Sequence, residues 1–348
     1  MTNSLQQIEL AICRSMNRLN LHSYISGVLS CDRRTVAKAI TLIESTQSQD
    51  RTLAQELLNK LSVETRQKNS FRIGISGPPG VGKSTFIEVL SLHLLSLDKR
   101  VAILAVDPTS RRSGGSILGD KTRMGRLVGK QDIFIRPSPT GETLGGVTRK
   151  TRETILILEA AGFDTIIVET VGVGQSETAV AGMVDFFTLL HLPGAGDDLQ
   201  GIKRGIMEAA NVIIVNKADG QFLEAAQQAK RGLKAALSML GAADTGWETE
   251  ILLASSLNNS GIPECWDCMW KFKLLMCKNG NLTRKRQQQN VNWMWTLVTD
   301  ELHERFNNHP GVQKRLEELK IAVNNETVTP VDAAAKLMQA FTETKNSE

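Results

Sequence analysis

The sequence predicts an α/β fold in which a mainly parallel β-sheet is covered on both faces by helices. Between residues 71 and 254, short apolar runs of strand length alternate with segments of helix length. Residues 1–68 and the chain after Gly261 instead carry apolar residues at helical spacing. We therefore expect a sheet-containing domain at 69–280, a helical N-terminal extension at 1–68 and a helical C-terminal extension at 281–348.

Composition and charge argue against several classes of protein. The 348 residues are 41% hydrophobic and 22% charged, which is ordinary for a globular protein with a sizeable core. The net charge of +4 is too small to indicate nucleic acid or a membrane as partner. No apolar run approaches the roughly 18 residues of a membrane span, and the 5 cysteines are scattered. The sequence shows no targeting pattern, so we expect a location in the reducing cytoplasm.

The predicted strands are short and apolar, as expected for strands buried on both faces. Ligands in such sheets bind beyond the carboxyl ends of the strands. In chain order the strands are Phe71–Ser76, Val101–Val106, Ile133–Arg136, Thr165–Val168, Phe186–Leu192, Val212–Val215 and Ile251–Ala254.

The C-terminal extension is predicted to be helical. Thr329 and Pro330 are expected to be the N-cap and first residue of its last helix, because proline lacks only an N–H that would be unpaired there. An earlier helix carries one apolar stripe, which fits either a core or a homodimer interface. The stripe consists of Val291, Met294, Trp295, Val298, Leu302 and Phe306.

The first chemical motif is a glycine-rich loop between a predicted strand and a helix expected to start near Ser84. Residues 77–84 fit the pattern GxxxxGK[ST]. Such a loop turns its backbone N–H groups toward phosphates, and the helix N-terminus adds positive potential. Lys83 is suited to the β- and γ-phosphates and Ser84 to Mg²⁺. The expected nucleotide-binding residues here are Gly77, Pro78, Pro79, Gly80, Val81, Gly82, Lys83, Ser84 and Thr85.

The second motif is Asn216-Lys217-Ala218-Asp219, which fits the guanine-recognition pattern NKxD directly after a predicted strand. The Asp219 carboxylate can accept from both N1–H and the exocyclic amine of guanine, whereas adenine lacks that amine. A site that pairs buried polar groups can reject the wrong base by about 10⁴–10⁵. The expected guanine-binding residues are Asn216, Lys217 and Asp219, with Ser255, Ser256 and Leu257 after the next strand.

Two acidic residues stand at predicted strand ends. Asp107 follows Val101–Val106, and Glu169 follows Thr165–Val168. Carboxylates at this sheet edge suit Mg²⁺, which often binds acidic groups through its waters. A helix cap or a salt bridge is the simpler alternative for each residue.

Seven ordered blocks across nearly the whole chain resemble the MeaB/ArgK-type GTPases, the chaperones of cobalamin-dependent methylmalonyl-CoA mutase. The resemblance implies a P-loop GTPase of the SIMIBI class that docks on a cobalamin-dependent acyl-CoA mutase and gates its cofactor loading. Family members also tend to dimerise through their C-terminal helices. The blocks are GPPGVGKST at 77–85, VDPTS at 106–110, GGSILGDKTRM at 114–124, RPSPTGETLGG at 136–146, VETVGVGQSE at 168–177, GAGDDLQGIKRG at 194–205 and NKAD at 216–219.

The resemblance also implies roles for particular residues. Segments 107–124 and 169–177 would be switches that respond to the γ-phosphate. Loop 194–205 would be a mobile segment linked to the partner, although an ordinary connection is the simpler alternative. The implied catalytic residues are Lys83, Asp107 and Glu169, and the implied Mg²⁺ environment is Ser84, Asp107, Asp120 and Glu169.

One position differs from the Ras-like pattern, in which a glutamine directly after the switch glycine orients the attacking water. Here Gly172 is followed by Val173, which has no polar group, and Gln175 lies two residues further on. We therefore expect slow hydrolysis by the isolated protein and acceleration by a partner.

Three other functions remain as alternatives. A metal-insertion GTPase usually has histidine-rich tracts or clustered cysteines, whereas this chain has 5 separated histidines. A P-loop kinase rarely carries NKxD. A scaffold that binds GTP without turnover is compatible with Val173.

Two local patterns are interpreted as structural. Cys265 and Cys268 lack a second cysteine or histidine pair that would complete a zinc site, so we expect them to pack in a core. The basic stretch Arg284–Arg286 is expected to be a solvated helix end.

Overall fold

The computed structural model describes residues 19–45, 47–64, 70–106, 124–137, 144–170, 176–194, 204–238 and 246–343. The chain forms two compact units, with the boundary between Lys285 and Arg286. Each unit is described separately below.

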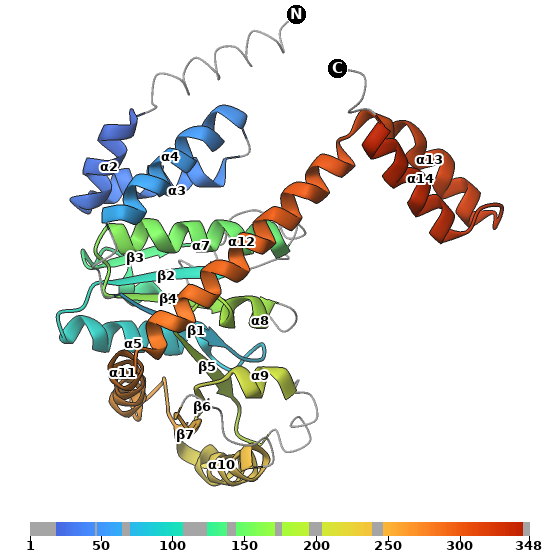
Figure 1. Ribbon diagram of the computed structural model, residues 1–348. Coiled ribbons are helices and arrows are strands. Elements are labelled where there is room, and N and C mark those ends of the chain that lie inside the picture. Colours follow the sequence, from blue (N-terminus) through green and yellow to red (C-terminus); the bar gives the residue numbers. More distant parts are fainter. Residues whose placement is uncertain are drawn as a thin grey trace, which may run out of the picture. The chain divides into compact units, whose positions relative to one another are not determined.

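The first unit is built on a seven-stranded parallel sheet with the strand order β3-β2-β4-β1-β5-β6-β7 (Figure 1). The strands are β1 Phe71–Ser76, β2 Val101–Val106, β3 Ile133–Arg136, β4 Thr165–Thr170, β5 Phe186–His191, β6 Val212–Val215 and β7 Glu250–Leu253. Four strands have the predicted bounds. The other three differ by one or two residues because pairing with neighbouring strands, which local apolarity does not reveal, determines where they end.

The largest of these differences concerns Glu169, which was predicted to follow its strand. It lies within β4, because Ala105 of β2 pairs with Glu169 and Val106 pairs with Thr170. Glu169 also pairs with Ile75 of β1 on its other side. The carboxylate is therefore held by a strand paired on both sides.

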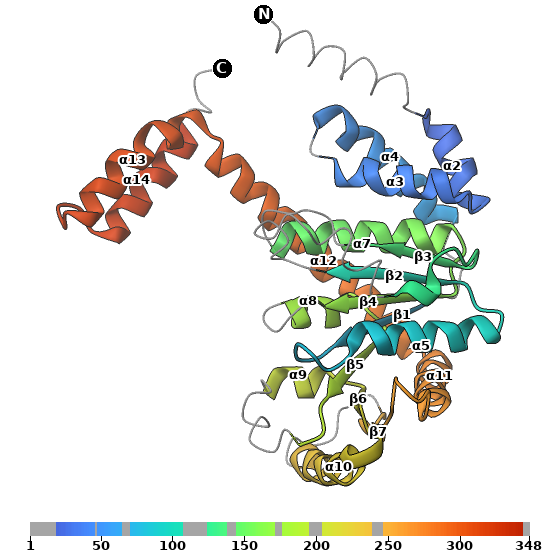
Figure 2. The same ribbon diagram turned by 180° about the vertical axis from the view of Figure 1, so that it is seen from behind.

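Helices cover both faces of the sheet (Figure 1 and Figure 2). On one face, α5 Lys83–Ser96 and α11 Ile262–Lys278 share an apolar core with alternate residues of the strands. Cys265 and Cys268 are buried in this core, which confirms the packing predicted for them. The other face is covered by α7 Leu144–Ala160, α8 Ser176–Ala181, α9 Arg204–Ala209 and α10 Leu223–Ser238. The short helices η1 Gly125–Leu127 and η3 Gly220–Phe222 complete this unit's connections.

In the part of the N-terminal region that the structure describes, the helices are α2 Leu21–Leu29, α3 Arg33–Glu44 and α4 Ser48–Glu64. Their apolar residues belong to the same core as α7, so they form an additional layer over that helix (Figure 1). The side chains of Asn20 and Asp32 accept backbone N–H groups at the starts of α2 and α3, as N-cap residues do.

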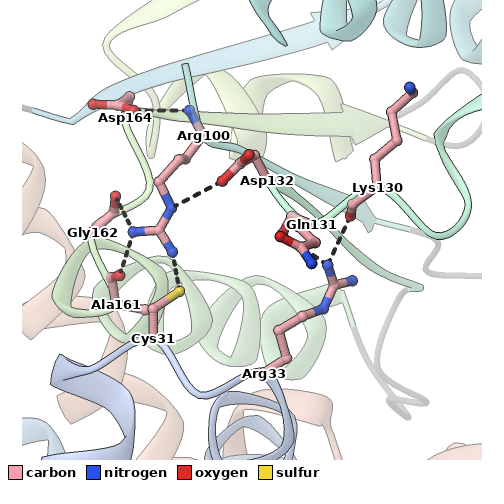
Figure 3. Close-up of polar contacts among 9 residues, drawn as sticks. All are labelled: Cys31, Arg33, Arg100, Lys130, Gln131, Asp132, Ala161, Gly162 and Asp164. Carbon is pink, nitrogen blue, oxygen red and sulfur yellow. Dashed lines mark hydrogen bonds and ion pairs between the residues drawn. The ribbon is translucent and has the colours of Figure 1, made fainter. Parts of the chain in front are cut away.

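Polar contacts attach α3 to β3 at both ends. At the start of α3, the Arg33 guanidinium donates to the carbonyl oxygens of Lys130 and Gln131, both at 2.9 Å (Figure 3). At its end, Glu44 pairs with Arg136, the last residue of β3. The helical extension thus lies along the β3 edge.

Arg100 adds a second attachment near the amino ends of the strands. Its guanidinium contacts the Cys31 sulfur in the turn before α3, and its backbone N–H donates to Asp164 Oδ2 at 2.9 Å (Figure 3). These contacts lie away from the carboxyl ends of the strands, where parallel sheets bind ligands.

The prediction of a solvated helix end at Arg284–Arg286 was wrong for Lys285, whereas Arg284 is exposed as expected. Lys285 lies inside α12 Asn281–Asn307, and its ammonium donates to the Asp185 carbonyl oxygen at 2.7 Å. Burial lowers the pKa of Lys285 below its ordinary value. The long aliphatic stem of lysine allows this burial of the side chain, which charge alone does not predict.

The second unit contains the rest of α12, α13 Pro310–Asn324 and α14 Pro330–Glu343. Phe341 of α14 packs on Phe306 and His309, with ring centroids 5.4 and 5.0 Å apart. Thr329 Oγ1 accepts the Asp332 N–H at 3.2 Å, which confirms the predicted start of the last helix. Among the described residues, no helix is long and apolar enough to cross a membrane.

Candidate functional site: a nucleotide site at the carboxyl edge of the sheet

The phosphate loop, residues 77–82, connects β1 to α5 and depends on glycine at two positions. Gly77 and Gly82 have φ angles of 150° and 91°. A Cβ atom at Gly77 would lie 2.6 Å from the Leu190 carbonyl oxygen, and one at Gly82 would lie 2.9 Å from Asn216 Nδ2. Any larger residue would therefore push the loop away from β5 or from Asn216.

Lys83 lies across the phosphate loop. Its ammonium donates to the carbonyl oxygens of Gly77 at 2.8 Å and Pro78 at 3.1 Å. These bonds hold a positive charge over the loop at the N-terminus of α5. The loop, the helix end and the ammonium together favour an anion at this position.

Ser84 and Glu169 meet in front of the sheet. The Ser84 hydroxyl donates to Glu169 Oε1 at 3.0 Å, and the glutamate is only 5% exposed. Hydroxyl and carboxylate oxygens are the hard ligands that Mg²⁺ prefers, so this pair fits the metal that the sequence resemblance implies. Among the described residues, no group of three or more His, Cys, Asp or Glu side chains could hold a metal. A Mg²⁺ here would depend on Ser84, water and phosphate oxygens as well as on carboxylates.

Asn216 ties the guanine loop, residues 216–219, to the phosphate loop. Its amide donates to the Val81 carbonyl oxygen at 2.8 Å. Its Oδ1 accepts from Ser256 twice, from the backbone N–H at 3.2 Å and from the hydroxyl at 2.8 Å. Asn216 is 1% exposed, so its side chain is enclosed by protein and not by solvent.

Lys217 makes a second link between the two loops. Its ammonium donates to the Gly80 carbonyl oxygen at 2.8 Å. The backbone of Lys217 has a φ of 59°, an uncommon value for a residue with a side chain. The loop after β6 thus adopts a constrained conformation that brings Lys217 to the phosphate loop.

Asp219 is positioned by Ser255. The Ser255 hydroxyl donates to Asp219 Oδ2 and accepts the Asn258 backbone N–H at 3.2 Å. Leu257, in the same turn, is 81% exposed. Sequence reasoning expected residues 255–257 at the guanine site but did not anticipate that Ser255 orients the Asp219 carboxylate.

The structure thus brings the residues predicted at 77–85, 169, 216–219 and 255–257 to one edge of the sheet. Other predicted positions lie outside the described residues. These are Asp107, Asp120, Val173 and Gln175, together with loop residues Asp198 and Lys203.

Residues 36–311 match the protein family described as methylmalonyl Co-A mutase-associated GTPase MeaB. The chain belongs to the MeaB family of GTPases. The expected family is therefore confirmed, and with it GTPase activity as the class of reaction.

Individual relatives of this MeaB-family GTPase agree with that assignment. A "Probable GTPase" of Mycobacterium tuberculosis is 48% identical over 90% of this chain and 93% of its own length. The mouse protein "Methylmalonic aciduria type A homolog, mitochondrial" is 44% identical over 91% of this chain and 78% of its own. A crystal structure of an "LAO/AO transport system kinase" is 34% identical with a TM-score of 0.74, covering 93% of this chain and 99% of that one. The predicted fold class, an α/β P-loop protein of the SIMIBI class with helical extensions, is confirmed.

Proposed function

We propose that this MeaB-family GTPase binds GTP with Mg²⁺ and serves as a chaperone that gates cofactor loading of a cobalamin-dependent acyl-CoA mutase. One observation carries the nucleotide part of the proposal. Asn216 and Lys217 join the guanine loop directly to the phosphate loop, at 2.8 Å each. Base and phosphates would therefore be bound by one connected structure, as a guanine nucleotide requires.

Phosphate binding would use the loop, the helix and the lysine together. Backbone N–H groups of residues 77–82 and the N-terminus of α5 provide positive potential. Lys83 would exchange its bonds to the Gly77 and Pro78 carbonyls for bonds to the β- and γ-phosphates. Such preorganised charge stabilises the transition state of phosphoryl transfer.

Ser84 would bind Mg²⁺ through its hydroxyl, and Glu169 would orient that hydroxyl or a metal-bound water. Asp107 and Asp120 are proposed as further members of this environment from their sequence blocks. When bound, Mg²⁺ neutralises charge on the β- and γ-phosphate oxygens. With Lys83, the carboxylates Asp107 and Glu169 make up the proposed catalytic set.

Guanine specificity would come from Asp219. Its carboxylate can accept both the N1–H and the 2-amino group of guanine, and Ser255 keeps it in place. Adenine would leave this partly buried carboxylate without the two donors that guanine offers, which is costly. We therefore propose GTP rather than ATP as the substrate.

Slow hydrolysis by the isolated protein is proposed because the residue after the switch glycine has no polar group to orient water. Val173 stands where Ras-like GTPases have the glutamine that orients water. A partner that supplies or orders the missing group would accelerate the reaction. The family description names methylmalonyl-CoA mutase as the associated enzyme, which supports a cobalamin-dependent acyl-CoA mutase as this partner.

A homodimer is proposed on the basis of the apolar stripe of α12. Five side chains of the stripe are 41–61% exposed in the single chain: Val291, Met294, Trp295, Val298 and Leu302. An exposed apolar stripe of this kind is typical of an interface. The reducing cytoplasm remains the proposed location, supported by the free thiols of Cys31, Cys265, Cys268 and Cys277.

The decisive experiment is single-turnover GTP hydrolysis with and without purified methylmalonyl-CoA mutase. Partner-supplied groups accelerate GTPases by about 10³–10⁵, which sets the scale of the expected effect. Asp198→Ala and Lys203→Ala, in loop 194–205, should reduce the acceleration and leave the basal rate and GTP binding unchanged. A rate indifferent to every candidate mutase would overturn the chaperone role. Transfer of phosphate to an acceptor other than water would favour the kinase alternative.

A further inference from the structure

Three buried polar side chains form a hydrogen-bond network beside the residues of the proposed nucleotide site. Thr170 Oγ1 donates to Ser76 Oγ at 2.8 Å, and Ser76 Oγ donates to Glu177 Oε1 at 3.4 Å. Ser76 and Thr170 are 0% exposed, and Glu177 is 3% exposed. Thr170 and Glu177 lie in segment 169–177, which the resemblance implies to be a switch, but the sequence motifs gave Ser76 no role and did not join the three residues. The available signal was the presence of polar residues at the ends of two otherwise apolar strands.

The direction of these hydrogen bonds follows from the chemistry of the groups. The Ser76 hydroxyl donates its hydrogen bond to a Glu177 carboxylate oxygen, which accepts it. The Ser76 oxygen is then an acceptor, and Thr170 donates to it. Glu177 therefore determines the orientation of both hydroxyl groups.

Each hydroxyl residue is the chain neighbour of a residue at the nucleotide site. Ser76 precedes Gly77, whose carbonyl oxygen accepts from Lys83. Thr170 follows Glu169, whose carboxylate accepts from Ser84. Where β1 pairs with β4, Ile75 lies opposite Glu169. The next residue of each strand, Ser76 and Thr170, therefore lies beside the other at the strand ends.

We propose that Glu177 is a positioning residue for the metal and phosphate site. From α8 it accepts from Ser76 and so orients the Thr170–Ser76 hydrogen bond that joins the ends of β1 and β4, which fixes the distance between the Lys83–Gly77 contact and the Ser84–Glu169 pair. This inference rests on the proposed binding of GTP with Mg²⁺ at that site. It adds a buried carboxylate outside the predicted metal-binding set.

A role in stability alone is the rival explanation, and the chain provides a matched control. At the other end of β1, Ser70 donates to Glu159, which also pairs with Arg72 at 2.7 Å. Glu159 is a buried carboxylate too, but it lies at the amino edge of the sheet, far along β1 from the phosphate loop. Its loss should affect stability and leave metal binding unchanged.

The test measures Mn²⁺ binding to the protein–GDP complex by electron paramagnetic resonance, together with thermal unfolding. Partners that orient metal ligands typically contribute 10- to 100-fold in affinity. We therefore expect Glu177→Gln to weaken Mn²⁺ binding about tenfold or more, while GDP affinity without metal stays within about twofold of wild type. Glu159→Gln should lower the unfolding temperature without changing Mn²⁺ affinity.

Thr170 variants test the same proposal with smaller changes, in case Glu177→Gln does not fold. Thr170→Val removes the hydroxyl at nearly constant volume and should weaken Mn²⁺ binding, whereas Thr170→Ser keeps the hydroxyl and should restore it. Equal Mn²⁺ affinity in Thr170→Val and wild type would overturn the inference while leaving the proposed metal site intact. A wild-type GDP complex that binds no Mn²⁺ would overturn both.

Discussion

The side-chain amide of Asn216 donates a hydrogen bond to the Val81 carbonyl oxygen at 2.8 Å, which joins the guanine loop to the phosphate loop. The same side chain accepts from the backbone and hydroxyl of Ser256. Three segments of the candidate nucleotide site, after β1, β6 and β7, therefore meet on one buried amide. A change at this amide should affect base and phosphate recognition together.

Replacing Asn216 by alanine should lower the affinity for both GTP and GDP at least tenfold. Each lost hydrogen bond is worth about 1 kcal/mol, and the Val81 carbonyl would be left unsatisfied at a further cost of about 1–3 kcal/mol. Isothermal titration calorimetry measures the affinities. The matched control is Asn211→Ala at the other end of β6, where Oδ1 accepts the Phe187 N–H at 2.8 Å. Weak binding in both variants, rather than in Asn216→Ala alone, would contradict a specific role for Asn216.

Asp219→Asn should reduce GTP and GDP affinity at least tenfold with the fold intact. Hydrogen bonds to a charged group are worth about 1.5–3 kcal/mol each, and the substitution removes the charge from two of them. Binding of xanthosine nucleotides should improve, because an amide can donate to the 2-oxo group that replaces the amine. Competition against a fluorescent GDP analogue measures both effects. Equal affinity of the wild type for ATP and GTP would show that the base assignment is wrong.

Lys83→Ala and Ser84→Ala should impair hydrolysis in different ways. Removing the Lys83 charge should abolish turnover at every Mg²⁺ concentration, because added Mg²⁺ does not replace the ammonium at the β- and γ-phosphates. Removing the Ser84 hydroxyl should instead raise the Mg²⁺ concentration needed for half-maximal rate. Phosphate release across a Mg²⁺ titration separates the two. Metal-independent turnover by the wild type would count against the proposed site.

The cysteines of α11 should differ in reactivity. Burial raises the pKa of the Cys265 thiol above its ordinary value of 9.0 and raises that of Cys268 to about 12. Both thiols stay protonated at pH 8, and only a thiolate is nucleophilic. Iodoacetamide at pH 8 should therefore label the exposed Cys277 in the native protein and spare Cys265 and Cys268 until unfolding. Mass spectrometry of the labelled peptides checks this, and early labelling of Cys268 would contradict the burial.

The raised pKa values of the same two thiols predict that the free energy of unfolding decreases at alkaline pH. Their folded pKa values lie above the unfolded value of 9.0, so the folded state retains protons that the unfolded chain releases. The stabilisation is complete below about pH 9 and decreases as the pH rises from there toward 12. Unfolding in urea between pH 8 and 11 measures the trend. Replacing both residues by alanine should flatten it, once the lower stability of that variant is taken into account.

The sequence by itself determined which segments become strands and which motif-bearing loops follow them. Apolar runs such as Val101–Val106 and Val212–Val215 are strands with the predicted bounds. The phosphate loop and the guanine loop were also identified correctly as loops after strands. These features are local, because apolar periodicity and glycine requirements are properties of neighbouring residues along the chain.

Tertiary structure alone decided which side chains meet. In the chain, β2 and β3 lie between β1 and β4, but in the sheet β1 and β4 are neighbours. That adjacency places Thr170 against Ser76, which Glu177 contacts from α8. The links from Asn216 to Val81 and from Lys285 to Asp185 depend in the same way on packing between distant segments. Hydrogen bonds between such segments are determined by strand order and register, which the local sequence pattern does not encode.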